Sequence, residues 1–121
     1  MVEITKICVL NGSRQEDAIV NGEWQTQKVT GEFGLAKGIY RLDTAQVVKP
    51  ADKAEYQGPI IHVSRDHAFQ KTDAGMVRHS LFTFKQKPEI GENAKIEYKM
   101  GKAILANRPP EQQAQAQGKG R

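Results

Sequence analysis

Short stretches in which apolar and polar residues alternate recur along the chain, and residues that favour turns separate them. The first stretch covers residues 2–10 and places Val2, Ile4, Cys8 and Leu10 on one side. Alternation with a period of two is typical of a β-strand with one buried face. The pattern therefore predicts a strand here, and no stretch has the longer period of a convincing helix.

Turn residues define the rest of the N-terminal half. Asn21-Gly22 suits a type I′ turn, because both residue types tolerate positive φ, and it predicts a hairpin over residues 19–29 that includes Trp24. A glycine-rich loop then leads to a predicted strand over residues 38–42. Residues 49–54 form a polar connector that could hold one helical turn.

Closely spaced apolar stretches fill residues 59–106 and predict five strands joined by short turns. Among them, Phe82, Phe84 and Tyr98 have the bulk expected of core residues. A meander that curls into a barrel would remove its exposed edges. We therefore expect a mostly β fold, with a small SH3-like or OB-like antiparallel barrel that follows an N-terminal β-hairpin region.

The composition changes at Arg108, after which no aliphatic residue is larger than alanine. Such a segment cannot bury enough surface to offset the entropy of ordering, which predicts a disordered tail or linker over residues 108–121. The barrel is expected over residues 56–107. Residues 1–55 are expected to form a β segment that packs on the barrel or extends it.

The net charge of +4 is uneven along the chain. Residues 1–60 contain 7 Lys and Arg against 8 Asp and Glu, whereas residues 61–121 contain 11 against 6. A basic excess in one half indicates an anionic partner, and the alternative is a solvated face that keeps the protein in solution.

The residue types needed for catalysis are scarce. Cys8 is the only cysteine, so an internal disulfide or a cysteine zinc site is excluded, and a buried, unreactive thiol is expected. No apolar run is long enough to cross a bilayer, and the first residues lack the layout of a secretory signal. These features predict a cytoplasmic protein without a membrane partner.

Three histidines, His62, His67 and His79, could converge, and Asp66 or Asp73 could add an oxygen ligand. Their spacing matches no established metal site, and no nucleophile or paired carboxylate accompanies them. We therefore predict no metal, no cofactor and no enzymatic activity.

Basic residues gather on the last predicted strands and their loops, as expected of a surface that follows the phosphates of single-stranded nucleic acid. With the bulky aromatics assigned to the core, Tyr56, Phe69 and Trp24 are left as candidates for stacking on bases. The predicted nucleic-acid-binding residues are Arg78, Lys85, Lys87, Lys95, Lys99 and Lys102.

Short motifs extend through the C-terminal half, at residues 56–63, 67–70, 77–81, 88–91, 96–98 and 101–103. Together they resemble the KfrB domain, a family found in proteins of plasmids and conjugative elements. The resemblance implies an SH3-like barrel and a role in plasmid maintenance, conjugative transfer or stability, and it implies no reaction.

Within these motifs, Gln70 and His79 lie on adjacent predicted strands. They could pair across the sheet, or they could contact a partner together with Tyr56. The family usually has an acidic residue after this histidine, where this chain has Ser80.

Three functions follow as hypotheses. The first is a non-catalytic interaction module, an adaptor that binds a protein of the plasmid transfer or maintenance machinery. The second is direct binding of single-stranded DNA or RNA by the barrel. The third is inhibition of a host or rival-plasmid enzyme.

Overall fold

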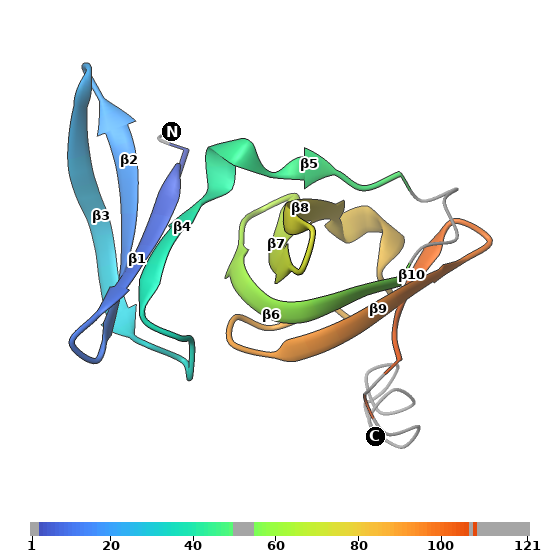
Figure 1. Ribbon diagram of the computed structural model, residues 1–121. Coiled ribbons are helices and arrows are strands. Elements are labelled where there is room, and N and C mark those ends of the chain that lie inside the picture. Colours follow the sequence, from blue (N-terminus) through green and yellow to red (C-terminus); the bar gives the residue numbers. More distant parts are fainter. Residues whose placement is uncertain (1–2, 50–54, 107, 109–121) are drawn as a thin grey trace, which may run out of the picture.

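The computed structural model of the chain describes residues 3–49, 55–106 and 108. These residues form two β-sheets and two short 3-10 helices, and they contain no α-helix. The mostly β class predicted from the alternating pattern is confirmed. Figure 1 shows the N-terminal sheet on the left and the C-terminal sheet on the right.

The N-terminal sheet is antiparallel and has the strand order β3-β2-β1-β4. Asn11-Gly12 and Asn21-Gly22 connect its first three strands, and positive φ at all four residues matches type I′ turns. The hairpin predicted at the second turn is therefore confirmed. The four strands are β1 (Lys6–Leu10), β2 (Ser13–Val20), β3 (Glu23–Gly31) and β4 (Gly38–Arg41).

The core face of β1 differs from the prediction. Ile7 and Val9 are fully buried against the C-terminal sheet, whereas Cys8 and Leu10 point to the opposite side. Both sides of this strand carry apolar residues, so alternation alone could not show which side the second sheet covers. Of the other two residues assigned to that side, Ile4 lies before β1, and Val2 is outside the described residues.

The C-terminal sheet has the strand order β10-β9-β6-β7-β8-β5. All its neighbouring strands are antiparallel except β5 and β8, which are parallel. Its elements are β5 (Gln46–Val47), β6 (Glu55–Val63), β7 (His67–Thr72), β8 (Gly75–Ser80), β9 (Asn93–Lys99) and β10 (Lys102–Leu105). The 3-10 helices are η1 (Leu42–Thr44) and η2 (Leu81–Thr83).

The strand order departs from a simple meander, because β9 pairs with β6 and not with β8. The first part of β6 pairs with β9 and its last part pairs with β7, with a shift of register between Ile60 and His62. After β8 the chain turns through η2, and Phe84 then forms a parallel bridge with Ala103 of β10. The bridge connects the segment that follows β8 to the far end of the same sheet.

Strand β6 is covered on both faces, as its consecutive residues Ile60 and Ile61 show. Ile60 packs in the core of the C-terminal sheet, whereas Ile61 packs with Ile7 and Tyr40 of the N-terminal sheet. Side chains of neighbouring strand residues point to opposite faces, so two fully buried isoleucines in sequence require cover on both sides. The N-terminal sheet provides one of these covers.

The structure also bears on the predicted aromatic core residues and on the predicted tail. Phe84 and Tyr98 are buried as expected, but Phe82 lies on η2 with 83% of its surface exposed, so its assignment to the core is wrong. Arg108, the first residue of the predicted tail, donates hydrogen bonds to the carboxylate of Glu92 at 2.7 Å and 2.8 Å. The rest of that tail and residues 50–54 of the predicted connector lie outside the described residues.

Candidate interaction surfaces

A buried arginine joins the two sheets. Arg14 of β2 is fully buried, and its guanidinium donates to the backbone carbonyl of Ile61 at 3.0 Å and to Glu16 at 2.6 Å. The same side chain donates to Nδ1 of His62 at 2.9 Å. A guanidinium can only donate, so Nδ1 must accept and the His62 proton must lie on Nε2. The joint therefore consists of an ion pair and a neutral imidazole.

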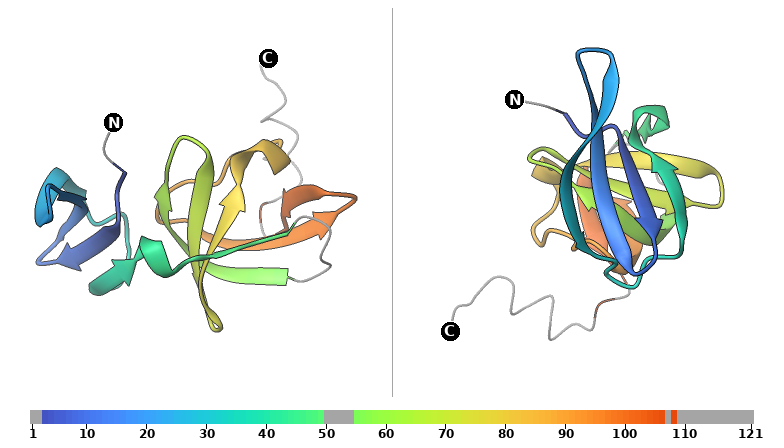
Figure 2. Two further views of the ribbon diagram at one scale, coloured as in Figure 1. Left: turned by 90° about the horizontal axis from the view of Figure 1, so that it is seen from above. Right: turned by 90° about the vertical axis from the view of Figure 1, so that its left-hand side faces the viewer.

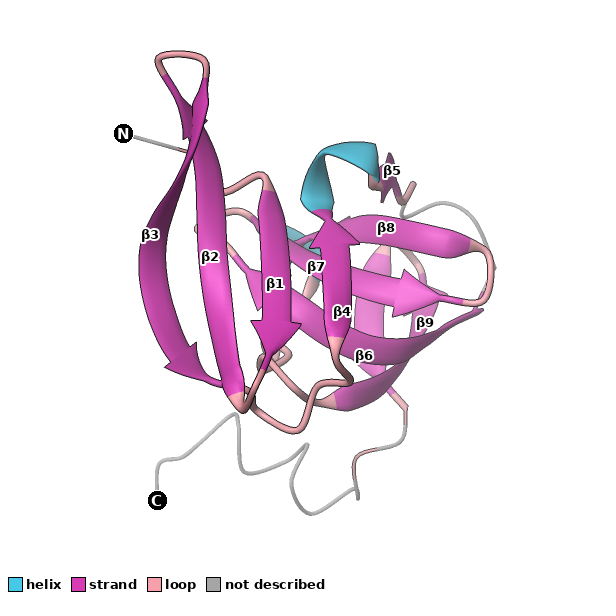
Figure 3. Cartoon of the chain, turned by 60° about the vertical axis from the view of Figure 1, so that its left-hand side comes forward, coloured by secondary structure: helices cyan, strands magenta, loops and turns pink. Residues whose placement is uncertain are grey.

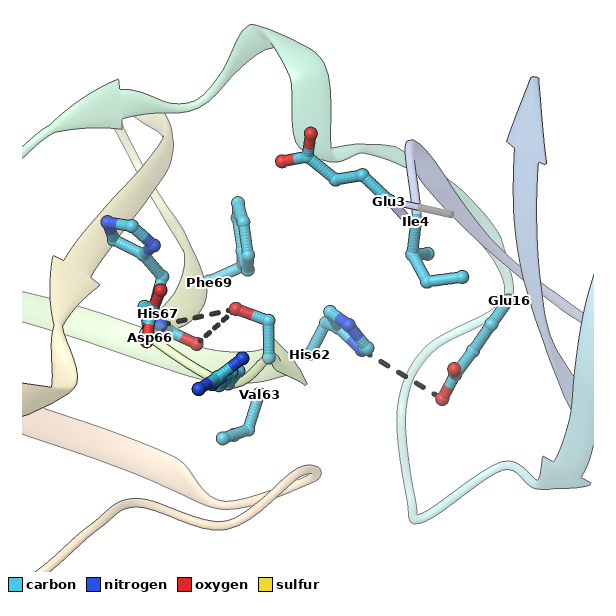
Figure 4. Close-up of a pocket in the computed structure, with 10 residues that line it drawn as sticks. Glu3, Ile4, Glu16, His62, Val63, Asp66, His67 and Phe69 are labelled. Atoms are coloured by element: carbon cyan, nitrogen blue, oxygen red, sulfur yellow. Dashed lines mark hydrogen bonds and ion pairs between the residues drawn. The ribbon is translucent and has the colours of Figure 1, made fainter. Parts of the chain in front are cut away.

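Burial lowers the pKa of His62 to about 4, although the nearby carboxylate of Glu16 acts in the opposite direction. Figure 4 shows the imidazole turned toward that carboxylate across the gap between the sheets, at 3.9 Å. A protonated imidazole would face the guanidinium of Arg14 as a second cation. The neutral form of His62 thus stabilises the joint.

Beside this joint lies a cavity of about 560 Å³ between the sheets (Figure 4). In the described part of the chain, no three of the His, Cys, Asp and Glu side chains are placed to hold a metal ion. Of the three histidines considered from the sequence, two border the cavity, whereas His79 lies in the other core. The lining residues are Glu3, Ile4, Glu16, His62, Val63, Ser64, Arg65, Asp66, His67 and Phe69.

The side chains of Gln70 and His79 point into the core of the C-terminal sheet, where both are fully buried. Nε2 of His79 lies 2.8 Å from Oε1 of Gln70, and Nδ1 lies 2.6 Å from the hydroxyl of Tyr98. The Gln70 amide nitrogen contacts three backbone carbonyls of β6 and β9, so its oxygen accepts from His79. Tyr56 is half-buried and packs edge-on against the His79 ring.

Burial favours the neutral form of His79, and in that form the proton lies on Nε2, which faces the Gln70 oxygen, so the Tyr98 hydroxyl donates to Nδ1. Burial lowers the pKa of His79 to about 4 and raises the pKa of Tyr98 to about 12. The observed partners of Gln70 and His79 all lie within the domain. The partner-binding role predicted for these two residues and Tyr56 stays a prediction.

The stability of the protein is expected to fall on acidification. In the unfolded chain the His79 imidazole titrates near pH 6.5, so between pH 6.5 and about 4 the unfolded state binds more protons than the folded state. At about pH 5 His79 alone lowers the free energy of unfolding by about 2 kcal/mol, and His62, whose pKa is lowered in the same direction, adds to the loss. Urea denaturation at about pH 7.5 and about pH 5 measures the loss. A His79 ring resonance that titrates near pH 6.5 in the folded protein would contradict it.

The basic residues predicted to contact nucleic acid lie on different elements and differ in exposure. Arg78 is half-buried on β8. Lys95 and Lys99 share the outward side of β9, but Lys95 lies 3.9 Å from the carboxylate of Glu55 and 4.0 Å from that of Glu97. Carboxylates therefore reduce the positive charge in the middle of this strand.

Apart from Lys95, all the lysines predicted to contact nucleic acid are exposed. Lys99 and Lys102 are register partners in the β9–β10 hairpin. Lys85 and Lys87 lie on the loop after η2, which the bridge between Phe84 and Ala103 brings beside β10. Part of the predicted basic surface is therefore gathered at one end of the C-terminal sheet.

The side of the N-terminal sheet that faces away from the C-terminal sheet, here called the outer face, carries large hydrophobic residues. No described element covers it in the right-hand view of Figure 2 or in Figure 3. Cross-strand pairing places Val29, Gln15, Cys8 and Ile39 in one row of this face. Its large hydrophobic side chains, which are 40% to 61% exposed, are Leu10, Ile19, Trp24, Val29 and Ile39.

Charged groups on the outer face surround Trp24. The ammonium of Lys6 lies 4.0 Å from the centre of the indole, and the guanidinium of Arg41 lies 5.6 Å from it. The carboxylate of Asp17 is buried and accepts hydrogen bonds from Thr26 and from the thiol of Cys8. Burial, followed by this hydrogen bond, raises the pKa of the Cys8 thiol, as expected of an unreactive cysteine.

Of the stacking candidates named from the sequence, Trp24 is exposed on the outer face, whereas Phe69 is buried between the sheets. Tyr56 is half-buried in the C-terminal core. Sequence reasoning missed both the outer face and the Arg14 joint. The outer-face residues belong to predicted strands, but their exposure depends on which side of the sheet the C-terminal half covers.

Comparison with known proteins identifies the family. The KfrB domain matches residues 55–107. Protein TraB of Escherichia coli is 39% identical over 116 residues, which cover 94% of this chain and 80% of that protein. The chain belongs to the KfrB-domain family. The sequence resemblance is thereby confirmed, and it indicates a plasmid- or conjugation-related protein.

The KfrB domain begins at β6 and ends just after β10, so it comprises the C-terminal sheet without β5. A match over 94% of the chain must also include most of the sequence that forms the N-terminal sheet. Neither the KfrB description nor the relative's name designates an enzyme. In the described part of the chain, no helix is long and apolar enough to span a membrane.

Proposed function

We propose that this KfrB-domain protein is a non-catalytic adaptor that binds a protein of the plasmid maintenance or conjugative transfer machinery. The proposal rests on the outer face of the N-terminal sheet, where five large hydrophobic side chains are exposed. Several large hydrophobic side chains exposed on one face are unfavourable in water and are typical of a surface that binds another protein.

The position of the outer face supports this function. It lies on the side of the N-terminal sheet opposite the buried joint between Arg14 and His62. That joint fixes the sheet to the KfrB domain, so a partner on the outer face would be held at a constant orientation to the domain. Such a geometry is suited to an adaptor, whose task is to position one protein relative to another.

Site-specific photo-crosslinking tests the proposal in cells that carry the element encoding the chain. A photoreactive residue at Val29 of the outer face should trap a protein encoded by the same element. The matched control is the same residue at Asp73, which is exposed on the β7–β8 turn of the KfrB domain. Equal trapping at both positions, or none at Val29, would reject the outer face as the adaptor surface.

A second candidate function is direct binding of single-stranded nucleic acid, and the exposed ring of Phe82 favours it. This ring supplies an aromatic surface on which a base could stack, at the end of the sheet where exposed lysines gather. Those lysines are Lys85, Lys87, Lys99 and Lys102.

On this second reading, affinity for a single-stranded oligonucleotide falls steeply with salt, and Phe82→Ala weakens binding while leaving the salt slope unchanged. Lys99→Ala reduces both the affinity and the slope, because it removes a phosphate contact. The absence of binding at low salt would exclude this candidate without affecting the adaptor.

A further inference from the structure

We propose that the outer face binds an amphipathic segment of a partner protein, one whose aliphatic side chains are flanked by carboxylates. This inference rests on the proposed adaptor function and adds the chemistry of the partner. It follows from the kinds of side chain on the face and from the sign of the charge that they leave exposed.

The charges of the outer face favour an acidic partner. Strand register places Lys6 and Arg41 in one row with Asp17. Asp17 is buried and already accepts two hydrogen bonds, whereas Lys6 forms no ion pair among the described residues. Arg41 pairs with Asp43 at its own end of the sheet. With Asp17 buried and Arg41 paired with Asp43, the exposed excess is the single positive charge of Lys6, which lies directly over Trp24.

The same charges disfavour a second copy of the chain on this face. Two outer faces related by a two-fold axis would bring the Lys6 ammonium groups of both copies into one apolar interface. Like charges brought together out of water oppose association. A partner that supplies carboxylates instead would neutralise these cations where the apolar side chains meet.

The composition of the face favours a protein over nucleic acid. Four of its five large hydrophobic residues are aliphatic, and they offer no ring on which a base could stack. The one aromatic, Trp24, has the Lys6 ammonium over its ring at 4.0 Å. Leucine, isoleucine or valine side chains of a partner would instead pack directly against Leu10, Val29 and Ile39.

Trp24 is the only tryptophan in the chain, so its fluorescence reports on the outer face alone. The probe is a synthetic amphipathic helix with a stripe of leucines flanked by glutamates, and the control peptide has lysine in place of each glutamate. The acidic peptide is expected to shift the emission of Trp24 to the blue and to protect it from acrylamide. Its affinity should exceed that of the basic peptide by about tenfold or more, the effect of one well-placed charge pair.

Two variants complete the test. Val29→Ser/Ile39→Ser should abolish binding of the acidic peptide, and Lys6→Glu/Arg41→Glu should make the basic peptide the tighter ligand. All four side chains point away from the core, so the circular dichroism spectrum should not change. A failure of the charge reversal to change the preference would overturn the inference.

Other outcomes also overturn it: equal affinity for both peptides, quenching of Trp24 by an oligonucleotide, or a blue shift that grows with protein concentration as dimers form. If neither peptide binds the outer face while crosslinking from Val29 still traps a protein encoded by the element, the adaptor function stands and only the partner chemistry is wrong. If neither peptide binds and crosslinking from Val29 traps no such protein, the adaptor function fails as well.

Discussion

Replacement of Arg14 by methionine is expected to lower the free energy of unfolding by about 3–5 kcal/mol, measured by urea denaturation. Methionine fills a similar volume but leaves the carboxylate of Glu16 buried without its cation. It also removes the donor to Nδ1 of His62 and to the carbonyl of Ile61. An unpaired buried charge costs far more than the lost contacts alone.

The matched control is Arg41→Met. Arg41 and Asp43 lie at the same N–O distance of 2.6 Å as Arg14 and Glu16, but both side chains of the control pair are exposed. The control should leave the urea midpoint unchanged, since exposed ion pairs contribute little. The addition of Glu16→Leu to Arg14→Met should restore part of the stability, because it removes the stranded carboxylate. Equal effects of the two arginine substitutions would show that the joint is not a buried ion pair.

Replacement of Gly58 by alanine is expected to lower the free energy of unfolding by about 3 kcal/mol or more. A β-carbon at this position would lie 1.8 Å from the carbonyl oxygen of Lys71, and the backbone φ is +149°. The obstacle is backbone, which cannot rotate away as a side chain can. The substitution must therefore separate β6 from β7 at the point where β6 passes from one partner strand to the other.

Gly31→Ala is the control for Gly58→Ala, because nothing lies within 4 Å of a β-carbon at Gly31. Its effect should stay within about 1 kcal/mol, and a small gain would be consistent with reduced freedom of the unfolded chain. Urea denaturation of both variants measures the difference. A loss for Gly58→Ala no larger than that for Gly31→Ala would mean that the two strands are not packed this closely.

The local signals in the sequence predicted the turns and the class of fold. Asn21-Gly22 could be assigned to a type I′ turn because the two residue types constrain φ directly. Asn11-Gly12, between β1 and β2, forms a second turn of the same type. Short-range rules of this kind depend on a few adjacent residues and need no tertiary information.

The parts that could not be predicted depend on contacts between distant residues. Strand β6 is covered on one face by the core of its own sheet and on the other by the N-terminal sheet, and its own sequence cannot specify either cover. Arg14 lies outside the strands predicted from the sequence, and nothing distinguishes it until Ile61 and His62, 47 and 48 positions later, are placed beside it. Phe82 looks like core by composition, and only the 3-10 helix that interrupts the strand pattern turns it outward.

The outer face of the N-terminal sheet is proposed to carry the function. A mating experiment with donors that produce either the natural chain or Val29→Ser/Ile39→Ser tests this proposal. Transconjugants and donors that retain the element are counted from the same mating, with protein amounts matched by immunoblot. At least one of the two counts is expected to fall for the variant. Counts equal to those of the natural chain, with the variant folded and present, would contradict it.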